Sequence, residues 1–357
     1  MPATYKILLM GASYGSLLAS KLLFGGHSIH LVCLPAEADL INAEGFKVRL
    51  PVRGRSEPVQ LESRKLPGKV TAGPATGVDP KAYDLVGLCM QEPQYRSPGV
   101  RELLAAVAKA KLPCMSIMNM PPLPYIKRIP GLDYKALEAA YTDPRVWDSV
   151  DPNKITLNSP DPQAIRPPDG KANELLVTLP TNFKCARFED EKDTAIVRQL
   201  EKDVEAARFD APEGKIEMPV KLKVYDSIFV PLAKWSMLLA GNYRCITKDG
   251  MRTAQEAVHS NLEESRSVYN FVFDLCVKLG ASPNDLVPFE KYAAAAQSLS
   301  RPASAARALQ NGAPNIERAD KLVQLIAKQK GLSNAAIDAQ VALVDERLDQ
   351  NRKKAAA

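Results

Sequence analysis

The sequence predicts an α/β fold in which a mostly parallel sheet is followed by an all-α C-terminal domain. Two observations carry this prediction. Short apolar runs alternate with helical patterns through the first half of the chain, and after about residue 220 only helical patterns recur. The chain has 357 residues, more than one hydrophobic core usually supports. We therefore expect two domains, residues 1–220 and residues 221–357.

Uninterrupted apolar runs indicate strands that are buried on both faces, as the inner strands of a parallel sheet are. A continuous apolar run occupies residues 6–10, and short, largely apolar segments at residues 28–34, 83–90 and 113–119 are further expected strands. Residues 46–52 alternate between apolar and polar side chains, which predicts a strand near the sheet edge, and residues 175–179 are another expected strand. Residues 121–170 are rich in proline and are expected to form irregular connections.

Helical periodicity is found between the strands and throughout the C-terminal part. The expected helices are residues 17–24, 100–110, 193–207, 226–240, 254–279, 290–299, 316–330 and 335–351. The first of them is terminated by Gly25 and Gly26.

The composition is that of an ordinary globular enzyme, with 46% hydrophobic and 25% charged residues. The net charge of +6 is spread along the chain, and the one dense basic run, residues 352–354, is interpreted as a solvated helix end. These features argue against a nucleic-acid partner. No apolar run approaches the ~20 residues of a membrane span, and the N-terminus lacks a signal-peptide pattern, so we expect a cytoplasmic protein without a membrane partner.

The six cysteines form no C-x-x-C pair, and the three histidines have no ligand spacing with them. We expect buried free thiols and no metal site.

The residues directly after the first strand carry the first functional signal. They are Gly11, Ala12, Ser13, Tyr14, Gly15 and Ser16. Strand, glycine turn, helix and strand follow one another within ~30 residues, the order of a Rossmann-type βαβ unit, whose turn lets a dinucleotide pyrophosphate approach the backbone and a helix N-terminus. The G-x-G-x-x-G fingerprint is degenerate, since Ser13 replaces its second glycine. We predict that these six residues bind a dinucleotide.

Two other interpretations of the turn exist. The same letters spell G-x-S-x-G, a nucleophile elbow in which Ser13 would attack an acyl group. That chemistry needs a histidine base, and His27, His30 and His259 are poorly placed to be one. A tight turn without any ligand is the second alternative.

The end of the second strand bears on the choice of cofactor. No acidic residue follows that strand until Glu37, so the carboxylate that usually accepts the ribose hydroxyls of NAD is missing. This favours NADP without excluding NAD. Arg53 and Arg55 could reach a 2′-phosphate, although two solvated arginines would look the same.

Several segments together carry a family resemblance. They are Gly25–Val32 (G-G-H-S-I-H-L-V), Ile41–Val48, Asn119 after its strand, Leu232-Ala233-Lys234-Trp235 with Asn242 eight residues beyond the lysine, and Ser304 followed by Gly312–Glu317. With these segments the chain resembles the ketopantoate reductases (2-dehydropantoate 2-reductases), as a divergent member of that family.

The resemblance implies an NADP-dependent reductase that transfers hydride to a 2-oxo acid or a related carbonyl or imine compound, built as a homodimer. It implies that Lys234 is the general acid, with Glu317 and Asn119 as further catalytic residues, Asn242 and Ser304 as substrate ligands, and Gln91 and Asn119 near the cofactor. Each assignment has a structural alternative: Lys234 could be a surface lysine, Asn242 a helix cap, and Glu317 and Ser304 helix-start residues. Asn315 competes with Glu317 for the acidic position.

Departures from the family pattern point to a different substrate. Gln91 stands where a lysine is usual, Leu238 replaces an asparagine, and Met120-Pro121-Pro122 replaces glycines. We expect a substrate larger or more apolar than ketopantoate. The alternatives are an opine-type dehydrogenase, for which His259 would be the catalytic histidine, and a non-catalytic NADP-binding regulatory protein.

Overall fold

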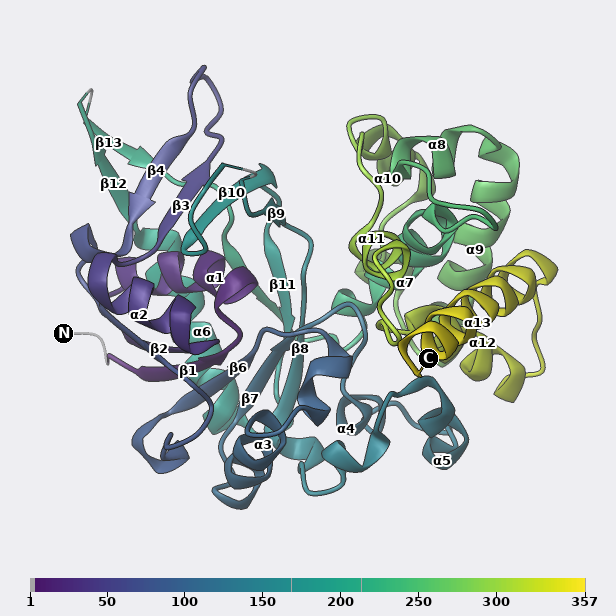
Figure 1. Ribbon diagram of the computed structural model, residues 1–357, viewed down its shortest axis with the longest axis horizontal. Coiled ribbons are helices and arrows are strands. Elements are labelled where there is room, and N and C mark those ends of the chain that lie inside the picture. The colour runs from purple at the N-terminus through teal and green to yellow at the C-terminus, as the bar shows by residue number, and fades with distance from the viewer. Residues whose placement is uncertain (1–3, 168, 213, 357) are drawn as a thin grey trace. The chain divides into compact units, whose positions relative to one another are not determined.

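The computed structural model of the chain describes residues 4–167, 169–212 and 214–356 (Figure 1). The chain divides into two compact units. Unit 1 comprises residues 1–90, 94–118 and 146–226, and unit 2 comprises residues 91–93, 119–145 and 227–357. Each unit is therefore assembled from segments that are distant in the sequence.

Unit 1 is built on an eight-stranded sheet. Its strands are β1 (Lys6–Met10), β2 (Ser28–Val32), β5 (Lys69–Gly73), β6 (Leu85–Leu88), β7 (Cys114–Ile117), β8 (Ile155–Ser159), β11 (Phe183–Ala186) and β14 (Leu222–Tyr225). The strand order is β14-β11-β8-β7-β6-β1-β2-β5, and every pair is parallel except β8 with β11. The predicted mostly parallel sheet is confirmed, and β1 lies at an inner position of it.

Two smaller sheets complete the strands of unit 1. One consists of β3 (Lys47–Leu50), β4 (Val59–Glu62), β9 (Gln163–Ile165) and β10 (Glu174–Leu179), in the order β4-β3-β10-β9. The other pairs β12 (Arg208–Ala211) with β13 (Gly214–Glu217). The alternating segment 46–52 was predicted at the edge of the main sheet, and that prediction is wrong. Its strand β3 pairs with β4 and β10 instead.

The helices of unit 1 are α1 (Ala12–Phe24), α2 (Pro35–Glu44), α3 (Val100–Lys109) and α6 (Glu191–Ala206). Helix α1 contacts β1 and β2 of the main sheet, β3 and β10 of the second sheet, and α6 (Figure 1). Because protein surrounds it, ten of its 13 residues are buried, including Lys21. The core formed here includes Leu17, Leu18 and Leu22.

Unit 2 is helical, with its named helices in the segments 119–145 and 227–357. They are α4 (Leu123–Ile126), α5 (Tyr134–Leu137), α7 (Lys234–Met237), α8 (Ala254–His259), α9 (Leu262–Leu279), α10 (Phe289–Ala296), α11 (Ser304–Gln310), α12 (Ala319–Gln329) and α13 (Ala335–Ala356). The predicted helical C-terminal part is confirmed. Within the described residues, no helix combines the length and apolarity that a membrane crossing requires.

Two predicted helices of unit 2 are interrupted. The region predicted as one helix over 226–240 forms a 3₁₀ turn at Val230–Ala233, the short α7, and a π-helical turn at Leu238–Asn242. Pro231 lacks an amide hydrogen and restricts the residue before it, which delays the α-helix. The predicted helix 254–279 is broken before Leu262, where the Asn261 side chain accepts a hydrogen bond from the Glu264 amide and begins α9.

Candidate functional site

The glycine turn follows β1 in unit 1, at the carboxyl end of an inner parallel strand. Gly11 has φ of 112°, a conformation that side-chain-bearing residues rarely adopt, and its amide donates to the Val32 carbonyl at 2.9 Å. A Cβ atom at Gly11 would lie 2.6 Å from Cγ of Met90. Glycine is therefore required at this position both by the backbone conformation and by the space.

Helix α1 begins at Ala12, five residues before the predicted start. Ser13 replaces the second fingerprint glycine and is compatible with helical backbone, so the turn shortens to Gly11 alone. No side chain in the described part of the chain caps α1. Its first amide groups, around the exposed Ser13, thus form the kind of helix N-terminus that attracts phosphate.

Tyr14 lies in the first turn of α1. Its hydroxyl donates to the Pro162 carbonyl at 2.5 Å, and its ring lies edge-on to Phe183. Burial, followed by the negative charge of Asp161, raises the pKa of Tyr14 well above its ordinary value. Tyr14 is therefore a neutral hydrogen-bond donor that ties the segment before β9 to the start of α1.

The three histidines have partners away from Ser13. His27 is paired with Asp203, His30 with the Thr71 hydroxyl, and His259 with the Ala293 carbonyl. Among the hydrogen bonds found between described residues, none joins a histidine to Ser13, so the arrangement offers no base for a serine nucleophile.

A small cavity in unit 2 brings together most of the other predicted site residues. It is lined by Gln91, Asn119, Leu238, Asn242, Tyr243, Ser304, Ala305 and Glu317. These residues come from the segment before α3, the segment after β7, the π turn after α7 and the 3₁₀ turn that follows it, the start of α11, and the segment before α12. Five predicted site residues therefore converge, although the sequence separates the first from the last by more than 200 positions.

Among the described residues, Glu317 is the one acidic residue that lines this cavity, and its side chain is buried. One carboxylate oxygen accepts from Nδ2 of Asn119 at 3.3 Å and the other from the Glu92 amide at 3.4 Å. Burial raises the pKa of Glu317 to about 7, while the hydrogen bonds from Asn119 and from the amides of Glu92 and Met120 act in the opposite direction. A carboxyl group with this pKa can donate or accept a proton near neutral pH.

Lys234 is not among the residues that line the cavity. It lies half-buried at the start of α7, and Asn242 lies at the end of the π turn that follows. The prediction that eight residues place both side chains on one helix face assumed a continuous α-helix. The π turn contains more residues per turn and alters that register.

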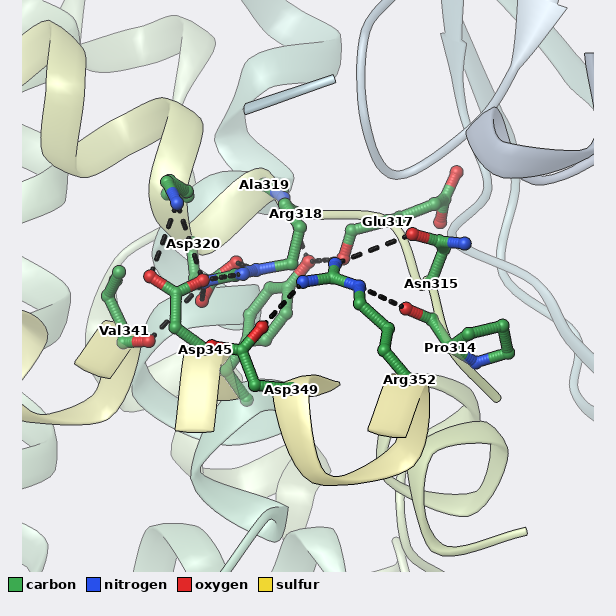
Figure 2. Close-up of polar contacts among 12 residues, drawn as sticks. Pro314, Asn315, Glu317, Arg318, Ala319, Asp320, Val341, Asp345, Asp349 and Arg352 are labelled. Carbon is green, nitrogen blue, oxygen red and sulfur yellow. Dashed lines mark hydrogen bonds and ion pairs between the residues drawn. The ribbon is translucent and has the colours of Figure 1, made fainter. Parts of the chain in front are cut away.

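In the sequence, Asn315 is the alternative to Glu317 for the position of the family's acidic residue. In the structure, Asn315 is not among the residues that line the cavity. Its side-chain oxygen accepts from Arg352 at 3.4 Å, whereas Glu317 lines the cavity. Figure 2 shows the two side chains on the same segment, with Asn315 directed towards α13.

A network of charges fixes the segment that carries Glu317 (Figure 2). Arg318 makes a bidentate ion pair with the fully buried Asp320, at 2.9 and 3.0 Å, and a further one with Asp345 of α13. Lys321 also pairs with Asp345, at 3.2 Å. Paired in this way, the buried charges anchor the backbone on the carboxyl side of Glu317.

Two residues at this site were missed by the sequence reasoning. Tyr243 lines the cavity, and its hydroxyl donates to the Glu317 carbonyl at 2.5 Å and accepts from the Ala319 amide at 2.9 Å. Glu92 is buried, and its carboxylate accepts two hydrogen bonds from Thr142. The only signals were their positions directly after Asn242 and Gln91.

No protein-family description matches the chain, and no curated protein matches it. Solved structures do. The 2-dehydropantoate 2-reductase of Methylococcus capsulatus matches with a TM-score of 0.64 and 12% identity over 97% of both chains. D-mandelate dehydrogenase, in a structure with NADH and anilino(oxo)acetate, has a TM-score of 0.62 and 13% identity over 97% of this chain and 99% of its own.

A dimeric ketopantoate reductase from Staphylococcus aureus matches with a TM-score of 0.61 and 9% identity, over 97% of this chain and 99% of its own. At these identities the likeness concerns the fold. The chain shares the fold of the ketopantoate reductases and of D-mandelate dehydrogenase along nearly its whole length.

Proposed function

We propose that the protein is a nicotinamide-dependent reductase of a 2-oxo acid or a related carbonyl or imine compound. The observation that carries this proposal is the cavity of unit 2, where the buried Glu317 carboxyl, with a pKa of about 7, lies with Asn119, Asn242 and Ser304. These groups can hydrogen-bond a carbonyl oxygen and a carboxylate and can supply a proton. The shared fold of an oxo-acid reductase and a hydroxy-acid dehydrogenase supports it.

The cofactor, NADP with NAD as the alternative, would supply the hydride when bound. The residues from Gly11 to Ser16 fit a dinucleotide, because Gly11 permits close approach and the start of α1 offers uncapped amides. Gln91 and Asn119 are proposed to contact its nicotinamide end. The proposed dinucleotide site thus rests on backbone groups, which a degenerate glycine pattern can still supply.

Two residues are candidates for the proton donor. Lys234 is proposed as the general acid on the family resemblance, with Glu317 orienting the substrate or the lysine. The structure gives Glu317 an independent claim, since its carboxyl lies at the cavity and titrates near neutral pH. Asn119, Asn242 and Ser304 would then hold the substrate, and Leu238 would provide an apolar wall.

The purified protein is mixed with NADPH or NADH and with a 2-oxo acid, either ketopantoate or a larger aliphatic or aromatic one. Oxidation of the nucleotide is monitored by its absorbance. We expect turnover, and faster turnover of the larger substrates. Efficient turnover of ketopantoate alone would contradict the substrate assignment. If turnover depends on an added amine, the opine-type reaction is correct, and cofactor binding without any turnover would identify a regulatory protein.

Variants separate the two proton donors. Lys234→Ala should lower turnover by ~10²-fold or more with little change in cofactor affinity if Lys234 is the general acid. If Glu317 donates the proton, activity falls as the pH rises through about 7, and Glu317→Gln removes that dependence. The exposed Lys291 of α10 provides the control Lys291→Ala. Near-normal turnover of Lys234→Ala would remove the lysine from the mechanism.

The assembly is proposed to be a homodimer, as the Staphylococcus aureus enzyme of the same fold is described to be. Light scattering during size-exclusion chromatography measures the mass directly. A mass near 39 kDa, that of one chain, would refute the dimer.

A further inference from the structure

A charged pair lies near the carboxyl end of β2, at a position where dinucleotide-binding sheets meet the adenosine ribose. Strand β2 ends at Val32, whose carbonyl accepts the hydrogen bond from the Gly11 amide, so the strand end and the glycine turn are neighbours. Helix α2 begins only three residues later, at Pro35. A dinucleotide on the turn would therefore place its adenosine half along this short connection.

Two side chains form the pair. Glu37, on the first turn of α2, accepts a hydrogen bond from Nη2 of Arg166 at 2.5 Å. Arg166 directly follows β9, and 129 residues separate the two in sequence. Both charges act on the thiol of Cys33, one residue beyond β2: burial and then the charge of Glu37 raise its pKa, the charge of Arg166 lowers it, and the net result is a pKa of about 12. Both charges therefore lie close to the strand end.

The side chains around the carboxyl end of β2 are exposed in a way that would let a ligand reach Arg166. Leu34 is 75% exposed, the largest value among the exposed large hydrophobic residues of the described chain. Glu37 is 13% exposed, whereas Arg166 is 45% exposed. An arginine has five N–H donors, and the hydrogen bond to Glu37 uses one of them. The guanidinium group can thus hold Glu37 and still donate to a second anion from its exposed side.

The charges favour one kind of ribose. In NAD-binding sheets a carboxylate at this strand end accepts hydrogen bonds from the ribose hydroxyls. Here the first carboxylate after the strand, that of Glu37, is already paired with Arg166. A 2′-phosphate would be attracted by the guanidinium, to which it can bind in a bidentate manner.

We propose that Arg166, held in place by Glu37, recognises the 2′-phosphate of NADP(H) and thereby sets the preference for NADP over NAD. This inference rests on the proposed function and names the cofactor class of its dinucleotide site. It replaces Arg53 and Arg55 as the phosphate ligands. Those arginines lie exposed in the connection between β3 and β4 of the second sheet.

The test measures nucleotide binding rather than turnover. The full-length protein is titrated calorimetrically with NADPH and NADH, and with 2′,5′-ADP and 5′-AMP as probes of the adenosine half. Arg166→Gln should lower the binding affinity for NADPH and for 2′,5′-ADP by ~10- to 100-fold, the usual effect of losing one or two charge-assisted hydrogen bonds. NADH and 5′-AMP should change by less than about twofold, which also shows that the variant is folded.

Glu37→Gln should have the opposite effect on the phosphorylated nucleotides, because it removes the negative charge that repels a phosphate, while the glutamine oxygen can still accept the hydrogen bond that holds Arg166 in place. We expect NADPH to bind ~3- to 10-fold more tightly, with greater sensitivity to salt. Retention of NADH binding again reports that the fold is intact.

Two controls carry the same kind of charge change elsewhere. Lys171→Gln breaks the Lys171–Glu44 pair at the other end of α2, where the atoms are 2.7 Å apart, and Arg53→Gln removes the earlier candidate. Both should leave the NADPH to NADH ratio unchanged. The inference would be overturned if Arg166→Gln left the ratio of NADPH affinity to NADH affinity unchanged, or if Arg53→Gln abolished the preference for NADPH. Absence of binding of either dinucleotide to the natural protein would instead refute the proposed function.

Discussion

Replacing Lys21 by methionine should stabilise unit 1 at neutral pH. Lys21 lies in α1, which packs against two sheets and a helix, and its side chain is 2% exposed. Its amino group has no hydrogen-bond partner among the described residues. Burial, followed by the positive charge of Lys221, lowers the pKa of Lys21 from 10.5 to about 7. An unpaired ammonium group is costly in such a place, whereas a thioether of similar length is not.

The size and the pH dependence follow from linkage between protonation and folding. A tenfold change in an equilibrium constant corresponds to about 1.4 kcal/mol, so a fall in pKa from 10.5 to about 7 corresponds to about 5 kcal/mol. The unfolded chain keeps the proton up to pH 10.5, whereas the folded chain releases it near pH 7. The full penalty thus applies below pH 7 and disappears progressively as the pH rises to 10.5. Lys21→Met should remove it.

The assay is denaturant-induced unfolding between pH 6 and 10, with fluorescence as the probe. The chain has two tryptophans, Trp147 in unit 1 and Trp235 in unit 2. In a Trp235→Phe background the remaining signal reports the unit that contains Lys21. Lys21→Met should raise the free energy of unfolding by up to about 5 kcal/mol at pH 6.5, and the gain should shrink towards pH 10. The exposed Lys109→Met is the control. A destabilised Lys21→Met, or a gain independent of pH, would refute the reasoning.

Two further changes test the buried charges and the glycine turn. Asp320→Asn leaves the buried Arg318 without its bidentate partner and should lower the free energy of unfolding of unit 2 by about 3–5 kcal/mol. Trp235 fluorescence reports this unfolding. Asp345→Asn should cost less, since Asp345 is 39% exposed. Gly11→Ala should destabilise unit 1 by about 1–3 kcal/mol or more, because of its φ of 112° and the contact with Met90. Gly54→Ala, which has a positive φ but nothing near its Cβ position, should cost less, and equal losses would disprove the contact.

Four inner strands of the main sheet could be predicted because they lie in short, largely apolar segments. These strands are β1, β2, β6 and β7. Strand β8 was missed, since its buried residues include Thr156, Asn158 and Ser159. Their polarity suggests a surface, yet the Thr156 hydroxyl donates to the Ala186 carbonyl and the Ser159 hydroxyl to Asp161. A buried hydroxyl whose partner lies 30 residues away, as for Thr156, leaves no periodic signal in the sequence.

The site was predictable only in part, for a similar reason. The glycine turn is local, so its strand, turn and helix are visible in consecutive residues. The cavity of unit 2 joins segments far apart in the chain, and the resemblance to a family supplied Asn119, Asn242, Ser304 and Glu317. Residue spacing alone did not reveal that Asn119 donates to Glu317, nor that a π turn separates Lys234 from Asn242.

The position of Glu317 depends on charges rather than on regular secondary structure. The residues between α11 and α12 form no helix or strand of their own, so their backbone needs other anchors. Helix α13 supplies them on both sides, through Arg352 to the Pro314 carbonyl at 3.0 Å and through Asp345 to Arg318 (Figure 2). The pKa of Glu317 reflects burial opposed by a few hydrogen bonds that this anchoring keeps in place. A loss of the Arg318 pairing should therefore disturb the acidity of the cavity together with the stability of unit 2.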